Sequence, residues 1–159
     1  MALVTKGVIR LRPATSLDAE CILKWRNEPE AVQASQSQQP VTLDEHLVWF
    51  HRVLAQDIPV HVFIIEQDGE PIGSCRITGE LVRMTIGWIS IVLTSYYHGY
   101  HLSWQVLDCL MGEATRRGFS ILKATVHRHN LASRKLFYGQ GFVIVGWSDT
   151  DWLEYERVL

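Results

Sequence analysis

Hydrophobic and charged residues alternate over residues 8–12 with the period of a half-buried β-strand. Two helical patterns follow. Hydroxyl and acidic residues at 15–18 precede apolar residues with helical spacing, and this first helix is expected to end near Pro29. A capping box at 42–45 begins the second helix. The apolar face of the second helix is predicted to contain Leu47, Phe50 and Leu54.

The pattern then changes to that of paired strands. Residues 61–65 are rich in β-formers, residues 67–70 contain an Asp-Gly hairpin signal, and residues 72–77 supply the return strand. Residues 84–93 are almost continuously apolar. Such a run is typical of a central strand that is buried on both faces.

The C-terminal half alternates between helices and strands. One helix face is predicted to hold Leu102, Val106, Leu110 and Ala114, and Gly118 ends that helix. A strand at 121–126 precedes a helix that begins after Asn130 and ends at Gly141, and two strands at 143–145 and 152–155 complete the chain. The order β-α-α-β-β-β-α-β-α-β-β predicts a single mixed α/β domain over residues 1–159, since no repeat or linker interrupts it.

Composition narrows the function classes. The 159 residues carry a formal net charge of −2, which gives no overall basic field for a nucleic acid. The three cysteines are distant from one another and form no C-x-x-C pair, so reduced thiols are expected. No signal peptide is visible and no apolar run approaches about 20 residues, so we expect a soluble cytoplasmic protein with no membrane partner.

Two segments resemble the GNAT N-acetyltransferase superfamily. The first is the strand-loop-helix at 91–103, where the family has an Arg/Gln-x-x-Gly-x-Gly/Ala loop that receives the pyrophosphate of CoA on backbone N–H groups. Here His98, His101 and Ser103 occupy the three motif positions. The cofactor-binding residues that the resemblance implies in this segment are Ile91, Val92, Leu93, His98, Gly99, Tyr100, His101, Leu102 and Ser103.

The second segment, 130–142, fits the family pattern N-x-x-S/A-x-x-L-Y/F-x-x-x-G-F. The resemblance implies that this helix packs beside the pantetheine arm of acetyl-CoA, with Asn130, Ser133 and Phe137 near the cofactor. The family often has a Tyr at the position of Phe137, where its hydroxyl protonates the departing thiolate. Tyr138 is adjacent and is the candidate replacement, although a shift of one residue turns a helical side chain by about 100°.

The N-terminal half resembles GNAT enzymes that acetylate amino-sugar nucleotides in nonulosonic acid pathways. The matching stretches are 11–14, 25–30, 45–50, 73–77 and 89–91. The resemblance implies a mixed, mostly antiparallel sheet of about seven strands flanked by about four helices. It also implies acetyl transfer to a 4-amino-sugar nucleotide. The substrate-binding candidates are Trp25, Asn27, Arg76 and Trp88.

The implied reaction is direct attack of a neutral amine on the thioester, which needs a base and an acid or water in their place. His46 is the candidate base or acceptor ligand, and Tyr138 is the candidate acid. A structural role remains open for both. The pair His98-x-x-His101 has helical metal-ligand spacing, but no third ligand accompanies it, so no metal is expected.

Other acceptors and one non-enzymatic role remain open. GNAT proteins of the RimJ/RimL type, which acetylate protein N-termini, share the extended N-terminal half, and small amines or aminoglycosides are a third acceptor class. The two replaced loop glycines and the missing Tyr favour a module that binds acyl-CoA without turnover, whereas the intact 130–142 segment favours an enzyme. A homodimer is expected by resemblance.

Overall fold

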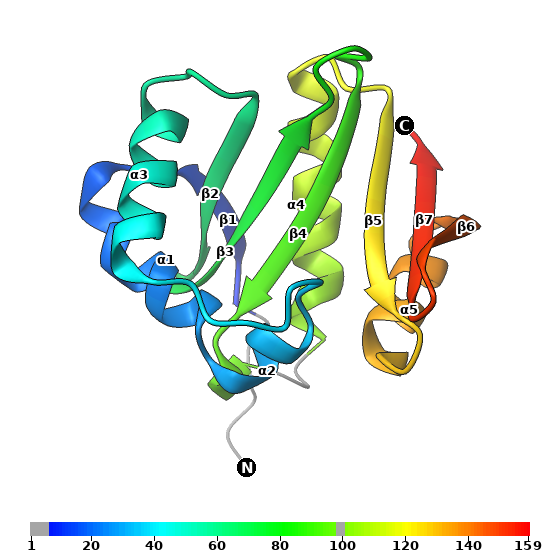
Figure 1. The fold of residues 1–159 in the computed structure, drawn as a ribbon, viewed down its shortest axis with the longest axis horizontal. Coiled ribbons are helices and arrows are strands. Elements are labelled where there is room, and N and C mark those ends of the chain that lie inside the picture. The colour runs from blue at the N-terminus through cyan, green and yellow to red at the C-terminus, as the bar shows by residue number, and fades with distance from the viewer. Residues whose placement is uncertain (1–6, 98–100) are drawn as a thin grey trace.

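The computed structural model describes residues 7–97 and 101–159. They form a seven-stranded sheet with helices on both faces (Figure 1). The strands are β1 (Ile9–Pro13), β2 (Val60–Gln67), β3 (Glu70–Gly79), β4 (Ile86–Leu93), β5 (Ile121–His127), β6 (Val143–Asp149) and β7 (Trp152–Val158). The helices are α1 (Ala19–Arg26), α2 (Pro29–Gln33), α3 (Leu43–Leu54), α4 (Leu102–Arg116) and α5 (Leu131–Gly139), with short 3-10 segments η1 (Ser16–Asp18) and η2 (Ser95–Tyr97).

The strand order across the sheet is β1-β2-β3-β4-β5-β7-β6. All neighbouring strands are antiparallel except β4 and β5, which are parallel. A parallel pair needs a crossover, and α4 supplies it. The prediction of a mixed, mostly antiparallel sheet of seven strands is therefore confirmed.

The main core lies between the sheet and the pair α4 and α5. The helix face predicted for α4 is confirmed, because Leu102, Val106, Leu110 and Ala114 are all buried. Gly118 follows α4 with a φ of 86°, a left-handed conformation that glycine adopts without steric cost.

A second, smaller core joins α1 and α3 to β2 on the opposite face. The prediction of which side of α3 is buried was wrong in part, because the helix is rotated about its axis relative to the predicted apolar face. Phe50 is buried, but Leu47 and Leu54 are 44% and 40% exposed. The buried positions are His46, Phe50 and Val53, because stacking of the His46 and Phe50 rings turns that side of the helix toward α1 and the sheet.

The structure has five α-helices where about four were expected. The additional one is α2, which begins directly after the predicted end of the first helix. Pro29 is its first residue, a position where the missing N–H has no helical partner to lose. The capping box of α3 is confirmed, with Thr42 N donating to Glu45 Oε2 at 3.1 Å and Glu45 N donating to Thr42 Oγ1 at 3.3 Å.

The prediction that β4 is buried on both faces holds for only part of the strand. Ile86, Ile89 and Leu93 are buried in the sheet core. Side chains farther along β4 that point to the other face, such as Trp88 and Ser90, are only half-buried. On this face α3 packs against β2, and α1 packs against β3 and β4. In the described residues no helix is long and apolar enough to cross a membrane.

Candidate functional site

The central feature of the site is a divergence between β4 and β5. These parallel strands pair at only three positions, Ile86 with Ile121, Gly87 with Leu122, and Trp88 with Lys123. Both strands continue for several residues beyond the last pair. Figure 1 shows the two ribbons separating toward their C-terminal ends. A sheet that opens in its centre exposes two backbone edges, and each can pair with an extended ligand.

The free edge of β4 is directed into this divergence. Thr94 N donates to Ile72 O at 2.9 Å, on the β3 side. Backbone groups alternate between the two sides of a strand, so those of Ile89 and Ile91 point toward β5, beyond the last β4–β5 pair. Amide groups of a pantetheine arm are suitable partners for such groups. The predicted cofactor segment 91–93 continues along this edge, and its binding of CoA stays a prediction.

The loop that is predicted to bind the CoA pyrophosphate, here called the donor loop, precedes α4. His98, Gly99 and Tyr100 lie outside the described residues. His101 is the N-cap of α4 and has a φ of 54°, in the left-handed region that favours glycine. Leu102 is buried, whereas Ser103 is half-buried. The family glycine that His101 replaces therefore corresponds to a real conformational demand, which His meets at some cost.

The second predicted cofactor segment is α5. Asn130 Oδ1 accepts a hydrogen bond from Ser133 N at 3.2 Å, so Asn130 caps the helix. Phe137 is 8% exposed and packs edge-on against Phe142, with ring centroids 5.0 Å apart. Its ring belongs to the core between α5 and the sheet. A Tyr hydroxyl at that position would enter an apolar environment.

Tyr138 lies one residue farther along α5 and is 79% exposed. Its hydroxyl has no hydrogen-bond partner among the described residues. The neighbouring aromatic residues of this turn thus have opposite environments, one ring in the core and one in water. The role of Tyr138 as the acid stays a prediction.

Two of the predicted acceptor residues lie on the sheet face that carries α1 and α3. Cys75, Ile77 and Ile89 point into the α4 core, so their strand neighbours Arg76 and Trp88 point to the opposite face. Arg76 is exposed, with its guanidinium carbon 5.7 Å from the Trp49 ring centre. Both side chains are therefore presented beside the β4–β5 divergence.

The indole of Trp88 is held on two sides. Its Nε1 donates to Glu80 Oε1 at 3.1 Å, and Lys123 Nζ lies 5.2 Å from the ring centre. Lys123 is itself bonded to Glu154 Oε1 at 2.9 Å, which raises the pKa of the ammonium group. These contacts hold the ring in place, and its role in the acceptor site stays a prediction.

The remaining predicted acceptor residues and His46 make contacts that join separate elements of the fold. Asn27 uses both ends of its amide on Val41, donating from Nδ2 at 2.7 Å and accepting at Oδ1 at 2.8 Å. Trp25 is buried in the smaller core. His46 is 4% exposed and its Nε2 donates to Ala19 O at 2.7 Å. This contact joins α3 to α1, and a catalytic or ligand role for His46 stays a prediction.

Glu28 is a residue of the site region that sequence reasoning did not single out. Its carboxylate accepts hydrogen bonds from Thr94 Oγ1 and Ser95 N, both at 2.9 Å. It thereby connects the α1–α2 junction to the segment that follows β4. The only signal in the sequence was its place in the Trp-Arg-Asn-Glu-Pro stretch, at the boundary between two helices.

The cysteines carry no sign of nucleophilic activation. Cys75 is buried, and Cys21 and Cys109 are partly buried. Desolvation by burial is the largest influence on each and raises the pKa of all three thiols. Within residues 7–97 and 101–159, no group of three His, Cys, Asp or Glu side chains is arranged to hold a metal ion.

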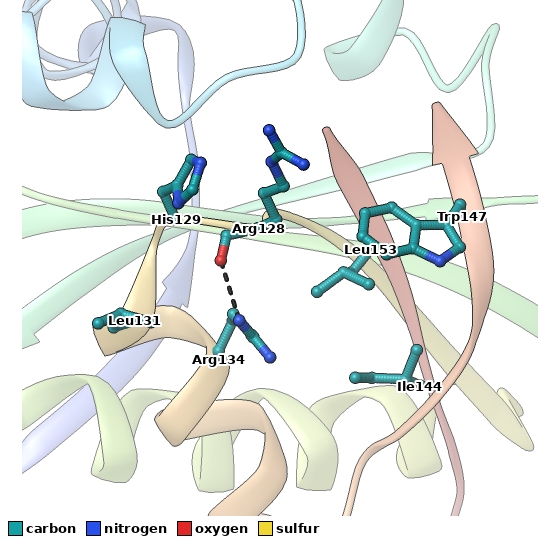
Figure 2. Close-up of a pocket in the computed structure, with 7 residues that line it drawn as sticks. All are labelled: Arg128, His129, Leu131, Arg134, Ile144, Trp147 and Leu153. Atoms are coloured by element: carbon teal, nitrogen blue, oxygen red, sulfur yellow. Dashed lines mark hydrogen bonds between the residues drawn. The ribbon is translucent and has the colours of Figure 1, made fainter. Parts of the chain in front are cut away.

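A shallow hollow of about 510 Å³ adjoins the Asn130 segment (Figure 2). It lies between the end of β5, the first turn of α5 and the β6–β7 hairpin. Arg134 Nη1 donates to Arg128 O at 3.0 Å across one side, while Trp147 and Leu153 form an apolar wall. None of the predicted site residues lines this hollow, so it is separate from the predicted constellation.

Solved structures with the same fold include proteins of several acceptor classes. A domain from Methanocaldococcus jannaschii matches with a TM-score of 0.83 and 21% identity, over 96% of this chain and 99% of that one. A ribosomal-protein-alanine N-acetyltransferase from Brucella melitensis gives 0.78 and 21%, over 94% and 99%. An aminoglycoside acetyltransferase in complex with coenzyme A gives 0.83 and 17%, over 95% of each chain. At these identities the likeness establishes the fold.

Comparison with curated protein sequences gave no match. The family model described as "Acetyltransferase (GNAT) domain" matches residues 9–143, which span the sheet from β1 to the start of β6 and include the divergence of β4 and β5. The chain therefore belongs to the GNAT acetyltransferase domain family.

Proposed function

We propose that this chain transfers the acetyl group of acetyl-CoA to the primary amine of a 4-amino-sugar nucleotide, by direct attack within a ternary complex. The observation that carries the proposal is the divergence of β4 and β5 after Trp88 and Lys123. It offers the donor a free backbone edge in the centre of the sheet. It also opens beside the face on which Arg76 is exposed.

The groups proposed to bind acetyl-CoA are mostly backbone N–H and C=O groups of β4 and α4. The N–H groups at the start of α4, from His101 to Ser103, are the natural receptors for the pyrophosphate, since the first amides of a helix have no helical acceptor. The β4 edge at 91–93 is suited to the pantetheine amides, and Asn130 and Ser133 border the other side from α5. A salmonella acetyltransferase of the same fold was solved with acetyl-CoA as its cofactor.

The chemistry requires little from individual side chains. Holding the amine and the thioester in line supplies much of the rate, and an N–H of the β4 edge can polarise the thioester carbonyl. Tyr138 is proposed to protonate the CoA thiolate. His46 is the proposed base, acting after release of its bond to Ala19 or through water, because its ring is buried in this structure.

The amino-sugar nucleotide is supported by the chemistry of the acceptor side. Trp88 and Trp49 offer flat surfaces, and Arg76 adds a guanidinium group that suits a phosphate. A protein N-terminus is the second candidate, supported by the fold shared with the Brucella enzyme and with RimL, which acts on ribosomal protein L7/L12. A peptide would need to extend along the open face of β5.

The test is CoA release by the purified protein, measured by thiol detection with acetyl-CoA and a panel of amines. The panel contains 4-amino-sugar nucleotides, N-terminal peptides and aminoglycosides. Turnover restricted to the nucleotides is the expected result. Turnover with peptides alone would retain the mechanism and replace the acceptor, and binding of acetyl-CoA without any turnover would favour the non-catalytic module. Failure to bind acetyl-CoA would refute the whole proposal.

A further inference from the structure

Two arginines on the acceptor side have no acidic partner. Arg76 projects from β3 on the α1–α3 face, and Arg26 is the last residue of α1, which packs on β3 and β4. In the described part of the chain neither forms an ion pair. Arg26 Nη2 makes one long contact of 3.5 Å with Ser37 Oγ, and Arg26 Nη1 is buried with no hydrogen-bond partner. Arg76 contacts the face of Trp49.

Several other cations in the described part of the chain have acidic partners. Arg12 bonds Asp18 and Glu66, and Lys123 bonds Glu154 and Glu156. A buried guanidinium nitrogen without an acceptor normally costs free energy, so proteins rarely leave one in place. Arg26, with its buried unpartnered Nη1, and Arg76 lie on the same face of the sheet, close enough for their charges to repel. This combination is typical of a site that is completed by an anion.

The environment of the two groups agrees with this interpretation. Desolvation lowers the pKa of the Arg26 guanidinium, and desolvation followed by repulsion from Arg26 lowers that of Arg76. An oxyanion between them would relieve the repulsion and supply the missing acceptor for Arg26 Nη1.

We propose that Arg26 and Arg76 form an oxyanion subsite that binds a carboxylate or phosphoryl group of the acceptor molecule. Arg76 is in register with Ser90 of β4, two residues beyond the last β4–β5 pair at Trp88. The subsite therefore lies one strand away from the opening for the thioester, at a distance suited to the far end of a small acceptor. The inference rests on the proposed function, since it assigns this face to the acceptor.

The subsite selects acceptors by charge. Two guanidinium groups attract an amine that carries a separate anionic group and repel a polycation. A nucleotide diphosphate satisfies this condition, and so does an amino acid carboxylate. A polycationic aminoglycoside does not.

The test is the binding of inorganic phosphate and of acetate to the CoA-loaded protein at constant ionic strength. Saturating CoA fills the pyrophosphate site, so that only a second anion site is measured. The apparent Kd is obtained from the thermal shift as a function of anion concentration. The variants are Arg26→Gln, Arg76→Gln and Arg76→Lys, with Arg52→Gln as the matched control, because Arg52 is an exposed arginine on α3.

The expected result is saturable anion binding by the wild type and by Arg52→Gln. Binding should weaken about tenfold or more in Arg26→Gln and Arg76→Gln, and by a smaller factor in Arg76→Lys, which keeps the charge and loses the planar fork. A stronger response to phosphate than to acetate would assign the subsite to a phosphoryl group, and the reverse to a carboxylate. Equal responses in the wild type and both Gln variants would overturn the inference.

CoA titrations of the same proteins distinguish a failure of the anion subsite from a failure of the proposed function. Intact CoA binding with no Arg-dependent anion response refutes the subsite alone. Absence of CoA binding to the wild type refutes the proposed function. If Arg26→Gln does not fold, Arg76→Gln decides the result, since Arg76 is exposed and its replacement leaves no buried group unpaired.

Discussion

Glu28 Oε1 accepts a hydrogen bond from Thr94 Oγ1 at 2.9 Å, and the second oxygen of the same carboxylate accepts one from Ser95 N. The contact spans 66 positions in the sequence. It joins the helices of the acceptor side to the segment that leads from β4 to the donor loop. One carboxylate thus connects the α1–α2 junction to the segment that follows β4.

Replacement of Glu28 by Ala is expected to affect both stability and donor binding. A hydrogen bond to a charged group contributes about 1.5–3 kcal/mol, and only the bond to Thr94 is part-buried while that to Ser95 is exposed. The variant should therefore lose about 2 kcal/mol of unfolding free energy, mostly through the bond to Thr94. The freed segment should weaken CoA binding about fivefold, as measured by calorimetric titration. Glu20→Ala, at an exposed position on α1, is the control. Unchanged CoA affinity in Glu28→Ala would show that the contact does not support the donor loop.

His101 occupies a left-handed conformation, with a φ of 54°. Replacement by Gly removes the clash between Cβ and the carbonyl oxygen that makes this region unfavourable, and should stabilise the protein by about 1 kcal/mol. The same change clears the space above the first amides of α4, so CoA should bind more tightly. Chemical denaturation and CoA titration measure the two effects. His101→Ala keeps the Cβ, and a gain of the same size in that variant would contradict the explanation.

Asp18 is expected to make stability depend on pH. Hydrogen bonds from Arg12 above all, and from Thr15, hold the pKa of the Asp18 carboxyl below its usual range. Since the folded pKa is depressed, the contribution is fully present above the unfolded value of about 4 and is lost as pH falls through the folded pKa. Asp18→Asn should therefore cost about 2 kcal/mol at pH 7 and much less at pH 2.

Urea unfolding at several pH values between 2 and 7 tests this dependence. Asp57→Asn, at an exposed position after α3, is the matched control and should follow the wild type throughout. A constant difference between Asp18→Asn and the wild type over the whole range would mean that the charge of Asp18 contributes nothing.

Tyr138→Phe separates catalysis from packing on α5. Because Tyr138 is 79% exposed, the change should alter the unfolding free energy by less than about 0.5 kcal/mol. If its hydroxyl protonates the thiolate, kcat should fall about tenfold or more while the KM for acetyl-CoA stays the same. A kcat equal to that of the wild type would leave this proton transfer to water.

The sequence by itself determined the order of the strands and of the four longer helices, and the side of α4 that is buried. Local signals account for this success. The capping box at Thr42, the Asp-Gly turn between β2 and β3 and the glycine after α4 each act within a few residues. The 130–142 motif could be recognised because it too is local: Asn130 caps the helix in which the motif lies.

The tertiary structure decided what the local pattern leaves open. The rotation of α3 depends on the stacking of His46 on Phe50 and on the carbonyl of Ala19 in another helix. The divergence of β4 and β5 depends on where pairing between two distant strands stops. The pairing of Glu28 with Thr94, and the placement of Arg26 and Arg76 on one face of the sheet, arise only when segments far apart in the chain are brought together. Such contacts have no period in the sequence, because they depend on the packing of the whole sheet.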